Sequence, residues 1–426
     1  MEIRKIKSSI KQIDKIYHVS DIHIRTLKRH KEYKTVFKNL FEYINTNATE
    51  NSVAVVTGDI VHSKLDMSPE LIQMLIEFFK GFTIPTIVIL GNHDMNLNNL
   101  YRLDAISPIL DGFVDSNIIF IKDNEVFEYG GITWNHMAVD VAPNEYIRGT
   151  DIDAPYKIAL HHGAVDTATT DIGYTISNKH VTTENFEGHD LVLLGDIHKP
   201  AQFLNDKKTI GYPGSLIQQN HGEALEHGIL VWDVKKKSSE FVKIENDYGY
   251  VTLITKGNKI IEHPKQMPKK PRIRIKFDNT DASDMKRLIA TIKKRYNVQD
   301  ISIQRSINNS INNVNANSVI GNIRDVEYQN TLLTDYVSTN FPQATEAEID
   351  AIRHINRNTN SKLPVLESVR HVTWKPLTFE FDNMFSYGQG NVVDFTCLES
   401  VCGLFAANTS GKSSLLDAIT YTIFDK

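Results

Sequence analysis

The segment Val53-Ala54-Val55-Val56-Thr57-Gly58-Asp59-Ile60-Val61-His62 joins a short apolar run to a polar turn. The run has the length of one strand, and its lack of polar residues indicates a strand that is buried on both faces. The same combination recurs along the first 250 residues. The apolar runs are Ile16-Tyr17-His18-Val19, Val53-Ala54-Val55-Val56, Ile87-Val88-Ile89-Leu90, Ile118-Ile119-Phe120-Ile121, Ile158-Ala159-Leu160 and Leu191-Val192-Leu193-Leu194.

Helical patterns lie between the first three runs, near residues 32–46 and 69–80. The second pattern opens with Ser68-Pro69, a typical N-cap followed by a proline in the first turn. Strands that alternate with helices predict an α/β layered domain over residues 1–250.

Composition limits the class of protein. The chain has 426 residues, a length that predicts two or three domains. It has 47 Lys and Arg against 52 Asp and Glu, which gives a formal net charge of -5. That charge excludes a uniformly basic nucleic-acid coat, so any DNA site has to be local. The two cysteines, Cys397 and Cys402, are too few for a disulfide scaffold, and no stretch approaches the ~20 apolar residues of a membrane helix. We expect an intracellular protein, cytoplasmic or nuclear and of cellular or viral origin, that is neither secreted nor bound to a membrane.

The rest of the chain predicts smaller parts. Residues 251–305 read as a small α+β domain, because a helical pattern near 284–296 lies between the strand 272–277 and a strand near 299–303. Residues 306–327 are rich in asparagine and predict a linker. Two helices, at about 328–339 and 346–356, form a helical segment over 328–357, and residues 366–426 form the last segment. The second helix carries Ile349, Ile352 and Ile355 on one stripe, which either another protein or a neighbouring helix of this chain has to cover.

Polar groups follow five of the apolar runs, where the carboxyl ends of parallel strands converge. They are Asp21-Ile22-His23, Gly58-Asp59-Ile60-Val61-His62, Gly91-Asn92-His93-Asp94, His161-His162-Gly163 and Gly195-Asp196-Ile197-His198. A single histidine at the end of a strand is most often a residue of the core or the surface. Five groups in order, each supplying oxygen or imidazole ligands, indicate a metal site.

The order and content of these groups resemble the calcineurin-like metallophosphoesterase superfamily. The resemblance implies a four-layer αββα sandwich with two metal ions at the strand ends. In the superfamily pattern Asp59 bridges the two ions. The ligands of one ion are Asp21, His23, Asp59 and His198, and those of the other ion are Asp59, Asn92, His162 and Asp196. Two ions about 3.5–4 Å apart can clamp a phosphodiester and lower the pKa of a shared water. Mixed oxygen and nitrogen ligands favour manganese, with magnesium, iron and zinc as alternatives.

The same pattern places His93 and His62 on the open side of the site. His93 then acts on the leaving 3′ oxygen or on a phosphate oxygen, Asp94 holds its tautomer, and His62 steadies the phosphate. A second interpretation makes His62 only a hydrogen-bonding neighbour of the ligands.

Three other histidines, His18, His30 and His161, are not expected to be ligands, because the pattern uses the histidine directly before glycine. One ligand position departs from the pattern of related nucleases, which carry Gly-His-x-His where this chain has Gly195-Asp196-Ile197-His198. A carboxylate can replace an imidazole as a ligand, but it adds negative charge and can alter the choice of metal.

Further segments resemble the SbcD-type nuclease subunit of the DNA double-strand-break repair complex, over about residues 1–305. They are Ser20-Asp21-Ile22-His23, Arg29-His30-Lys31-Glu32-Tyr33 and Tyr212-Pro213-Gly214-Ser215 with Gly222-Glu223. In that family a small second domain caps the active site and helps to position DNA, which implies DNA contacts for Arg272, Arg274 and Lys276. The alternative is an ordinary solvated edge strand. The resemblance also implies a homodimer whose helices at 328–357 dock on an SMC-like ATPase of the SbcC type.

The end of the chain, about residues 370–426, resembles the start of such an SbcC-type ATPase. Its Gly403-Leu404-Phe405-Ala406-Ala407-Asn408-Thr409-Ser410-Gly411-Lys412-Ser413-Ser414 is similar to a phosphate loop, in which backbone amides, a lysine and a hydroxyl bind ATP and magnesium. The nucleotide-binding residues would be Asn408, Gly411, Lys412, Ser413 and Ser414. Because Ala406 stands where the first glycine belongs, and because the chain stops before a Walker B acid, we expect no ATP hydrolysis by residues 1–426.

The sequence thus predicts a metal-dependent DNA nuclease, a 3′ to 5′ exonuclease on duplex DNA and an endonuclease on single strands. One alternative is a metallophosphatase or phosphodiesterase for a small substrate. Another is a non-catalytic scaffold that tethers DNA ends and whose metal site has drifted at Asp196.

Overall fold

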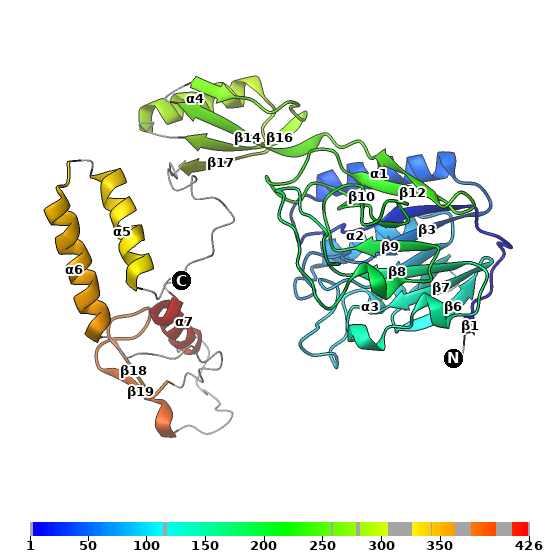
Figure 1. Cartoon of the computed structure of the whole chain (residues 1–426), viewed down its shortest axis with the longest axis horizontal. Helices are drawn as coiled ribbons and strands as arrows, with labels where there is room; N and C mark the ends of the chain where they lie inside the picture. The colour runs from blue at the N-terminus through cyan, green and yellow to red at the C-terminus, as the bar shows by residue number, and fades with distance from the viewer. Residues whose placement is uncertain are drawn as a thin grey trace. The chain divides into compact units, whose positions relative to one another are not determined.

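The computed structural model describes residues 3–113, 117–256, 259–277, 282–305, 326–341, 343–362, 376–397 and 411–424. The chain divides into two compact units, residues 1–308 and 309–426, and each is described by itself (Figure 1).

A six-stranded sheet with the order β13-β12-β2-β3-β4-β5 contains the first four predicted strands. The strands from β2 to β5 run parallel, and β12 pairs antiparallel with β2 and β13. Their bounds are Lys15–Val19 (β2), Ser52–Thr57 (β3), Thr86–Ile89 (β4), Ile118–Phe120 (β5), Gly228–Asp233 (β12) and Ser238–Lys243 (β13). All six residues of β3 are buried, which confirms the interpretation of its apolar run.

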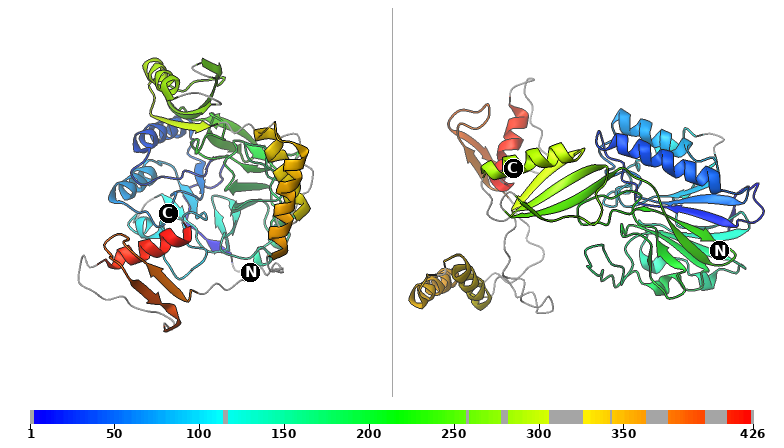
Figure 2. Two further views of the ribbon diagram at one scale, coloured as in Figure 1. Left: turned by 90° about the vertical axis from the view of Figure 1, so that its left-hand side faces the viewer. Right: turned by 90° about the horizontal axis from the view of Figure 1, so that it is seen from above.

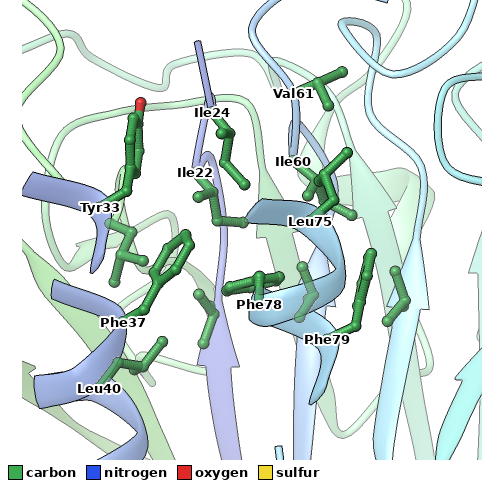
Figure 3. Packing of buried hydrophobic residues seen from close by; sticks show 14 of the residues in the cluster. Ile22, Ile24, Tyr33, Phe37, Leu40, Ile60, Val61, Leu75, Phe78 and Phe79 are labelled. Carbon is green, nitrogen blue, oxygen red and sulfur yellow. The ribbon is translucent and has the colours of Figure 1, made fainter. Parts of the chain in front are cut away.

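Two helices cover the outer face of this sheet and lie side by side (Figure 2). They are α1 (His30–Asn47) and α2 (Pro69–Lys80), and the Ser68 side chain caps α2 as predicted. Phe37 of α1 and Phe78 of α2 pack with their ring centroids 4.9 Å apart. Figure 3 shows these side chains against Ile22, Ile24, Ile60 and Val61, which follow β2 and β3. This packing anchors the segments that carry the polar groups of the site.

A seven-stranded sheet with the order β1-β6-β7-β8-β9-β11-β10 packs against the inner face of the first sheet. Its strands are Arg4–Lys5 (β1), Glu125–Tyr129 (β6), Ile132–Met137 (β7), Lys157–His162 (β8), Leu191–Gly195 (β9), Gln202–Phe203 (β10) and Ile210–Tyr212 (β11). The core between the sheets contains the buried indoles of Trp134 and Trp232. The mixed α/β class predicted from the sequence is therefore confirmed.

The outer face of the seven-stranded sheet differs from the helical layer that the superfamily pattern implies. Among the described residues, this face is covered by loops and by the 3₁₀ helix η3 (Thr183–Phe186) rather than by long α-helices. Phe186 and Val165 pack there on Ala159 and Val192 of the sheet. Two more 3₁₀ helices, η1 (Pro143–Glu145) and η2 (Gly149–Asp151), and the one-turn helix α3 (Ser107–Leu110) complete this domain.

A smaller four-stranded sheet, β15-β14-β16-β17, follows in the same unit. Its strands are Tyr248–Lys256 (β14), Lys259–Glu262 (β15), Lys270–Phe277 (β16) and Asp300–Arg305 (β17), and α4 (Ala282–Arg295) packs on one face. Ile273 and Ile275 face α4, while Arg272, Arg274 and Lys276 occupy the other face, as the alternation predicts. Because β16 lies between β14 and β17, the alternative of an edge strand is wrong.

The second unit contains a helix pair, α5 (Val326–Asn340) and α6 (Glu346–Lys362). The bounds of α5 lie close to those predicted, whereas α6 continues six residues past its predicted end at 356. Ile349 is buried and Ile355 is 64% exposed, so the packing of α6 on α5 covers only part of the isoleucine stripe. The unit also holds the hairpin β18 (Thr378–Phe381) and β19 (Asn391–Asp394), the 3₁₀ helix η4 (Phe395–Cys397) and α7 (Lys412–Phe424). In the part of the chain that the structure describes, no helix combines the length and the apolar character that crossing a membrane requires.

Candidate metal centre

The predicted ligands come from five loops that meet where the carboxyl ends of the two sheets adjoin. Asp21 and His23 follow β2, Asp59 follows β3 and Asn92 follows β4, all from the six-stranded sheet. From the seven-stranded sheet, β8 ends at His162, and Asp196 and His198 follow β9. The parallel strands therefore bring together residues that lie up to 177 positions apart in the sequence, from Asp21 to His198.

Asp59 lies between histidines of the two sheets. Its Oδ1 is 3.3 Å from Nε2 of His162, and its Oδ2 is 3.5 Å from Nε2 of His23. The two oxygens of one carboxylate thus face two different groups of side chains, which is the geometry of a bridging ligand.

The first group consists of Asp21, His23 and His198. Asp21 Oδ1 is 3.8 Å from the Nε2 atoms of both histidines, and these two nitrogens are 3.0 Å apart. Because two imidazole nitrogens and a carboxylate oxygen converge on one point, this group can hold a cation.

The second group adds Asn92 and Asp196 to Asp59 and His162. Asn92 Nδ2 donates to Asp196 Oδ1 at 3.3 Å, and this Oδ1 is 3.8 Å from Nε2 of His162. The backbone N–H of Asp196 donates to Asp21 Oδ2 at 3.1 Å. The aspartate that departs from the family pattern thus lies among the other predicted ligands.

Unsatisfied polar atoms test whether metal ions fit here. Asp21 Oδ1, Asn92 Oδ1 and His162 Nε2 are buried and make no well-aligned hydrogen bond. Buried polar atoms normally have partners, and an atom without one calls for a ligand, an ion or a water. Because these atoms are oxygen and imidazole donors in one cluster, the residues present fit divalent cations.

Electrostatics supports the same fit. Burial raises the pKa of Asp21 to about 6 and also raises the pKa of Asp196. Burial opposes ionisation of Asp59 as well, but the neighbouring His162 outweighs it and holds the pKa of Asp59 below its ordinary value. A divalent cation among these carboxylates would favour the ionised form of all three.

The backbone around the ligands is unusual. Asp21, His23 and Asp59 each have φ 51° and Asp196 has φ 99°, in the region that most L-residues avoid. The loops also approach one another closely at glycine, since a Cβ on Gly91 would lie 2.2 Å from Asp59 Oδ1. Gly91 thus leaves the space into which the bridging carboxylate fits.

His93 and His62 lie beside this cluster on its accessible side. The backbone N–H of His93 donates to Asp59 Oδ1 at 2.9 Å, and its Nε2 is 4.0 Å from Asp59 Oδ2. The His93 ring is 43% exposed and stacks on His62 with the centroids 5.7 Å apart. Burial lowers the pKa of His62, which favours its neutral form. Both histidines are therefore within reach of a molecule that contacts the cluster.

Asp94 does not contact the His93 imidazole, contrary to the role predicted for it. The Nδ1 atom of His93 lies 2.7 Å from the His62 carbonyl oxygen, which instead holds the tautomer. Asp94 is fully buried and accepts three backbone N–H bonds at 2.9 Å, from Ile60, Val61 and Gly91. Burial, followed by the charge of Asp59, raises the pKa of Asp94 to about 7. This side chain joins the two ligand loops and does not serve His93.

The three histidines that were not expected to be ligands have other partners. His161 Nδ1 lies 2.9 Å from the Met137 carbonyl oxygen, and His30 Nε2 lies 2.8 Å from the Arg25 carbonyl oxygen. His18 Nε2 is 2.9 Å from the hydroxyl of Thr57.

Two contacts to the ligands were missed by the sequence interpretation. His162 Nδ1 lies 2.7 Å from the backbone carbonyl of Thr57, and His198 Nδ1 lies 2.9 Å from Oε1 of Glu223. A backbone carbonyl leaves no signal in residue type. Glu223 is 25 residues from His198, and no spacing rule connects the two.

The residues predicted to bind DNA are not equally available. Arg272 is 12% exposed, and its guanidinium forms an ion pair with Glu32 at 2.7 Å inside the protein, so it is less available to DNA. Arg274 and Lys276 on the same face are half-buried. Of the predicted nucleotide-binding residues, Asn408 lies outside the described residues, as does the side chain of Lys412, while Gly411, Ser413 and Ser414 lie at the start of α7.

Comparison with known proteins agrees with this geometry. Residues 14–200 match the model of the calcineurin-like phosphoesterase family, whose members use divalent metals. An uncharacterized protein of Acanthamoeba polyphaga mimivirus is 37% identical in an alignment 440 residues long, and this alignment spans 97% of this chain and 32% of the viral protein. The chain thus spans about a third of the length of this relative. All seven predicted ligands fall within residues 14–200, so the candidate metal centre lies in the part of the chain that is similar to the calcineurin-like phosphoesterase family.

Proposed function

We propose that the chain is a metal-dependent nuclease that hydrolyses the phosphodiester bonds of DNA. The observation that carries the proposal is the position of Asp59, whose oxygens lie 3.3 Å from His162 and 3.5 Å from His23. This geometry suits a carboxylate that bridges two cations. Such pairs of cations serve phosphodiester hydrolysis in many enzymes.

Asp21, His23, Asp59 and His198 would hold one ion, and Asp59, Asn92, His162 and Asp196 would hold the other. Two bound divalent ions, manganese in our proposal, would polarise the phosphodiester and lower the pKa of an attacking water. His93 would place its Nε2 against the leaving 3′ oxygen, because the His62 carbonyl oxygen fixes the other ring nitrogen at 2.7 Å. In its protonated form His93 can then donate a proton from Nε2.

A basic cavity near the centre favours a polyanionic substrate. The cavity has a volume of about 700 Å³ and is lined by Arg25, Lys28 and Lys31, and also by Arg29 and Arg272, which pair with Glu32. Arg25, Lys28 and Lys31 are therefore the basic side chains that could bind phosphates. Arg25 is two residues beyond His23, and its charge, after burial, helps to lower the pKa of His62 beside the ligands. A duplex or single strand of DNA has phosphates on both sides of the bond to be cleaved, and positive side chains beside the centre would bind them.

By the same resemblance to SbcD-type nucleases, we propose 3′ to 5′ exonuclease action on duplex DNA and endonuclease action on single strands. A homodimer that docks on an SbcC-type ATPase through α5 and α6 is part of this proposal. The exposed Ile355 on α6 is an apolar side chain that such a partner could cover.

A small-substrate phosphodiesterase is the second candidate. A cavity of about 290 Å³ adjoins Asp196 and His198 and is lined further by Asp171, Ile172 and Lys199. A space of this size beside the ligands could hold a single small ester in place of a strand.

The test compares two substrates under one set of metals. The purified chain is incubated with manganese, magnesium, iron or zinc and either linear duplex DNA or bis(p-nitrophenyl) phosphate. We expect degradation of DNA with manganese. Rapid hydrolysis of the small ester with intact DNA under every metal would favour the second candidate.

A further inference from the structure

The ring of His198 is held by a carboxylate from a distant part of the chain. His198 Nδ1 lies 2.9 Å from Glu223 Oε1, while Nε2 of the same ring faces Asp21 Oδ1 at 3.8 Å. An imidazole that donates from Nδ1 keeps the lone pair of Nε2 free for a metal ion. The contact with Glu223 therefore selects the tautomer that a ligand needs.

Glu223 is itself fixed from several sides. Its Oε2 accepts the backbone N–H of Gln219 at 2.5 Å, and its Oε1 accepts Nδ2 of Asn220 at 2.7 Å. The side chain is only 7% exposed. A carboxylate with this many donors has little rotational freedom, so it can define the orientation of the ring it contacts.

Gln218 connects this turn to the small four-stranded sheet. The Oε1 atom of Gln218 accepts the backbone N–H of Tyr250 in β14 at 2.6 Å, and its Nε2 donates to the Tyr250 carbonyl at 3.1 Å. The same Nε2 donates to the backbone carbonyl of Glu223 at 2.9 Å. One buried amide thus joins a strand of the small sheet to the residue that holds His198.

A second ligand histidine of the centre, His162, is oriented differently. His162 Nδ1 lies 2.7 Å from the carbonyl of Thr57, the last residue of β3. That carbonyl belongs to a strand whose residues are all buried, whereas Glu223 lies in a turn. The orientation of His198, unlike that of His162, therefore depends on contacts outside the six-stranded and seven-stranded sheets.

We propose that Glu223 is a positioning residue for the metal ligand His198, and that Gln218 couples this positioning to the small sheet through Tyr250. The inference rests on the proposed two-metal centre. It assigns to the small sheet an effect on the metal centre that operates through hydrogen bonds of the chain itself, in addition to any contact with substrate.

The first experiment reads the tautomer of His198 without metal at pH 10, where the ring is neutral. Burial lowers the pKa of His198, but the hydrogen bond with Glu223 outweighs it and raises this pKa to about 9. The full chain is labelled with ¹⁵N-histidine, and the ring nitrogen shifts are compared for wild type, Glu223→Gln, Glu223→Ala and Glu226→Gln. Glu226 is a matched control because it lies three residues away and is 63% exposed. We expect Nδ1–H in wild type and in the control, and a mixture of tautomers in Glu223→Ala. Glu223→Gln keeps an acceptor oxygen and should retain most of the Nδ1–H form.

The second experiment titrates manganese into the same proteins by calorimetry. Loss of a group that orients a ligand typically lowers metal affinity by about 10–100-fold. We expect a loss of this size for one of two ions in Glu223→Ala, a smaller loss in Gln218→Ala and no change in Glu226→Gln. Circular dichroism establishes that each variant is folded, and Glu223→Gln remains informative if the alanine variant is not.

The outcomes separate this inference from the proposed function. A folded Glu223→Ala protein with wild-type tautomer and wild-type manganese affinity overturns the role of Glu223. Wild-type behaviour of Gln218→Ala overturns the coupling to the small sheet. A wild type that binds no divalent metal contradicts the two-metal function instead, while the nitrogen shifts still report whether Glu223 holds the His198 ring.

Discussion

Glu32 of α1 and Arg272 of β16 form an ion pair of 2.7 Å inside the protein, between the domain of the two large sheets and the small sheet. Glu32 also accepts hydrogen bonds from Arg29 at 2.9 and 3.0 Å and from Asn246 at 2.9 Å. The guanidinium of Arg272 lies over the rings of Tyr248 and Tyr250. One carboxylate thus pairs with two largely buried arginines and joins two parts of the unit.

We predict that Glu32→Gln strongly lowers the free energy of unfolding at neutral pH. Its side chain is 1% exposed, and removing one partner of a buried pair typically costs about 3–5 kcal/mol. Burial opposes ionisation, but the contact with Arg29 outweighs it and lowers the pKa of Glu32. The stabilisation is therefore present above the unfolded pKa and is lost as the pH falls through the folded pKa.

Urea unfolding of wild type and Glu32→Gln between pH 7 and pH 3 measures this. The difference in the free energy of unfolding between wild type and Glu32→Gln should be largest at pH 7 and should become smaller toward pH 3. The control is Glu42→Gln, on an exposed position of the same helix, which should stay within about 0.5 kcal/mol of wild type. A gap that is constant with pH would show that the charge of Glu32 is not the cause.

Asp59→Asn should nearly abolish phosphodiester hydrolysis while the fold survives. The change keeps the shape of the side chain but removes the charge that both groups of ligands share. The loss should exceed the ~100-fold upper range for residues that only orient a ligand. Turnover of DNA with manganese and metal content by mass spectrometry are the measurements. Wild-type turnover by this variant would rule out Asp59 as the bridge.

His93→Ala should retain bound metal and lose most of its turnover. His93 lies beside the ligands with an accessible ring, and proton transfer by such a side chain typically contributes about 10²–10⁴-fold. His162→Ala is the comparison, because His162 is a predicted ligand and its loss should remove metal. If His93→Ala loses as much metal as His162→Ala, His93 is itself a ligand and the proposed proton donor is wrong.

Gly91→Ala should weaken manganese binding and reduce stability, although Gly91 has no side chain that could bind metal. The added Cβ would meet Asp59 Oδ1 at 2.2 Å and the Asp59 backbone nitrogen at 2.3 Å, so the bridging residue has to move. Inserting a methyl group into a packed site typically costs about 1–3 kcal/mol. Gly112→Ala is the control, since its added Cβ would meet its nearest neighbour at 3.4 Å. Thermal unfolding measures the stability of both variants, and titration measures their affinity for manganese. Equal stability and equal affinity of Gly91→Ala and Gly112→Ala would contradict the role of Gly91 in making room for Asp59.

The parallel strands could be predicted from the sequence because burial on both faces leaves runs such as Val53 to Val56 without polar residues. The hairpin of β6 and β7 was missed. Its turn, Gly130-Gly131, has two positive φ values of 57° and 74°, so a signal for a tight hairpin was present in the glycine pair. The loops over the seven-stranded sheet have no period in sequence, and their packing on Ala159 and Val192 follows from tertiary contacts alone.

The clustering of the candidate ligands could be predicted from the sequence, whereas the contacts of individual side chains could not. Seven ligand positions follow strand ends, and parallel strands place such positions together. The role of Asp94 could not be read from its place after His93, because its partners are backbone groups of residues 60, 61 and 91. The alternating pattern of its strand predicted that Arg272 is free to bind DNA. In the structure Arg272 forms an ion pair with Glu32, which lies 240 residues earlier in the sequence.

The left-handed backbone at Asp21, His23, Asp59 and Asp196 limits which residues evolution or design can place there. Aspartate, asparagine and histidine enter this region far more readily than β-branched or bulky residues. Each of these four positions therefore has two requirements, a side-chain donor atom and a residue type that tolerates positive φ. An exchange of aspartate for glutamate, for example, keeps the donor atom but not the residue type that this backbone conformation favours. Fewer residue types are therefore tolerated at these four positions than ligand chemistry alone would allow.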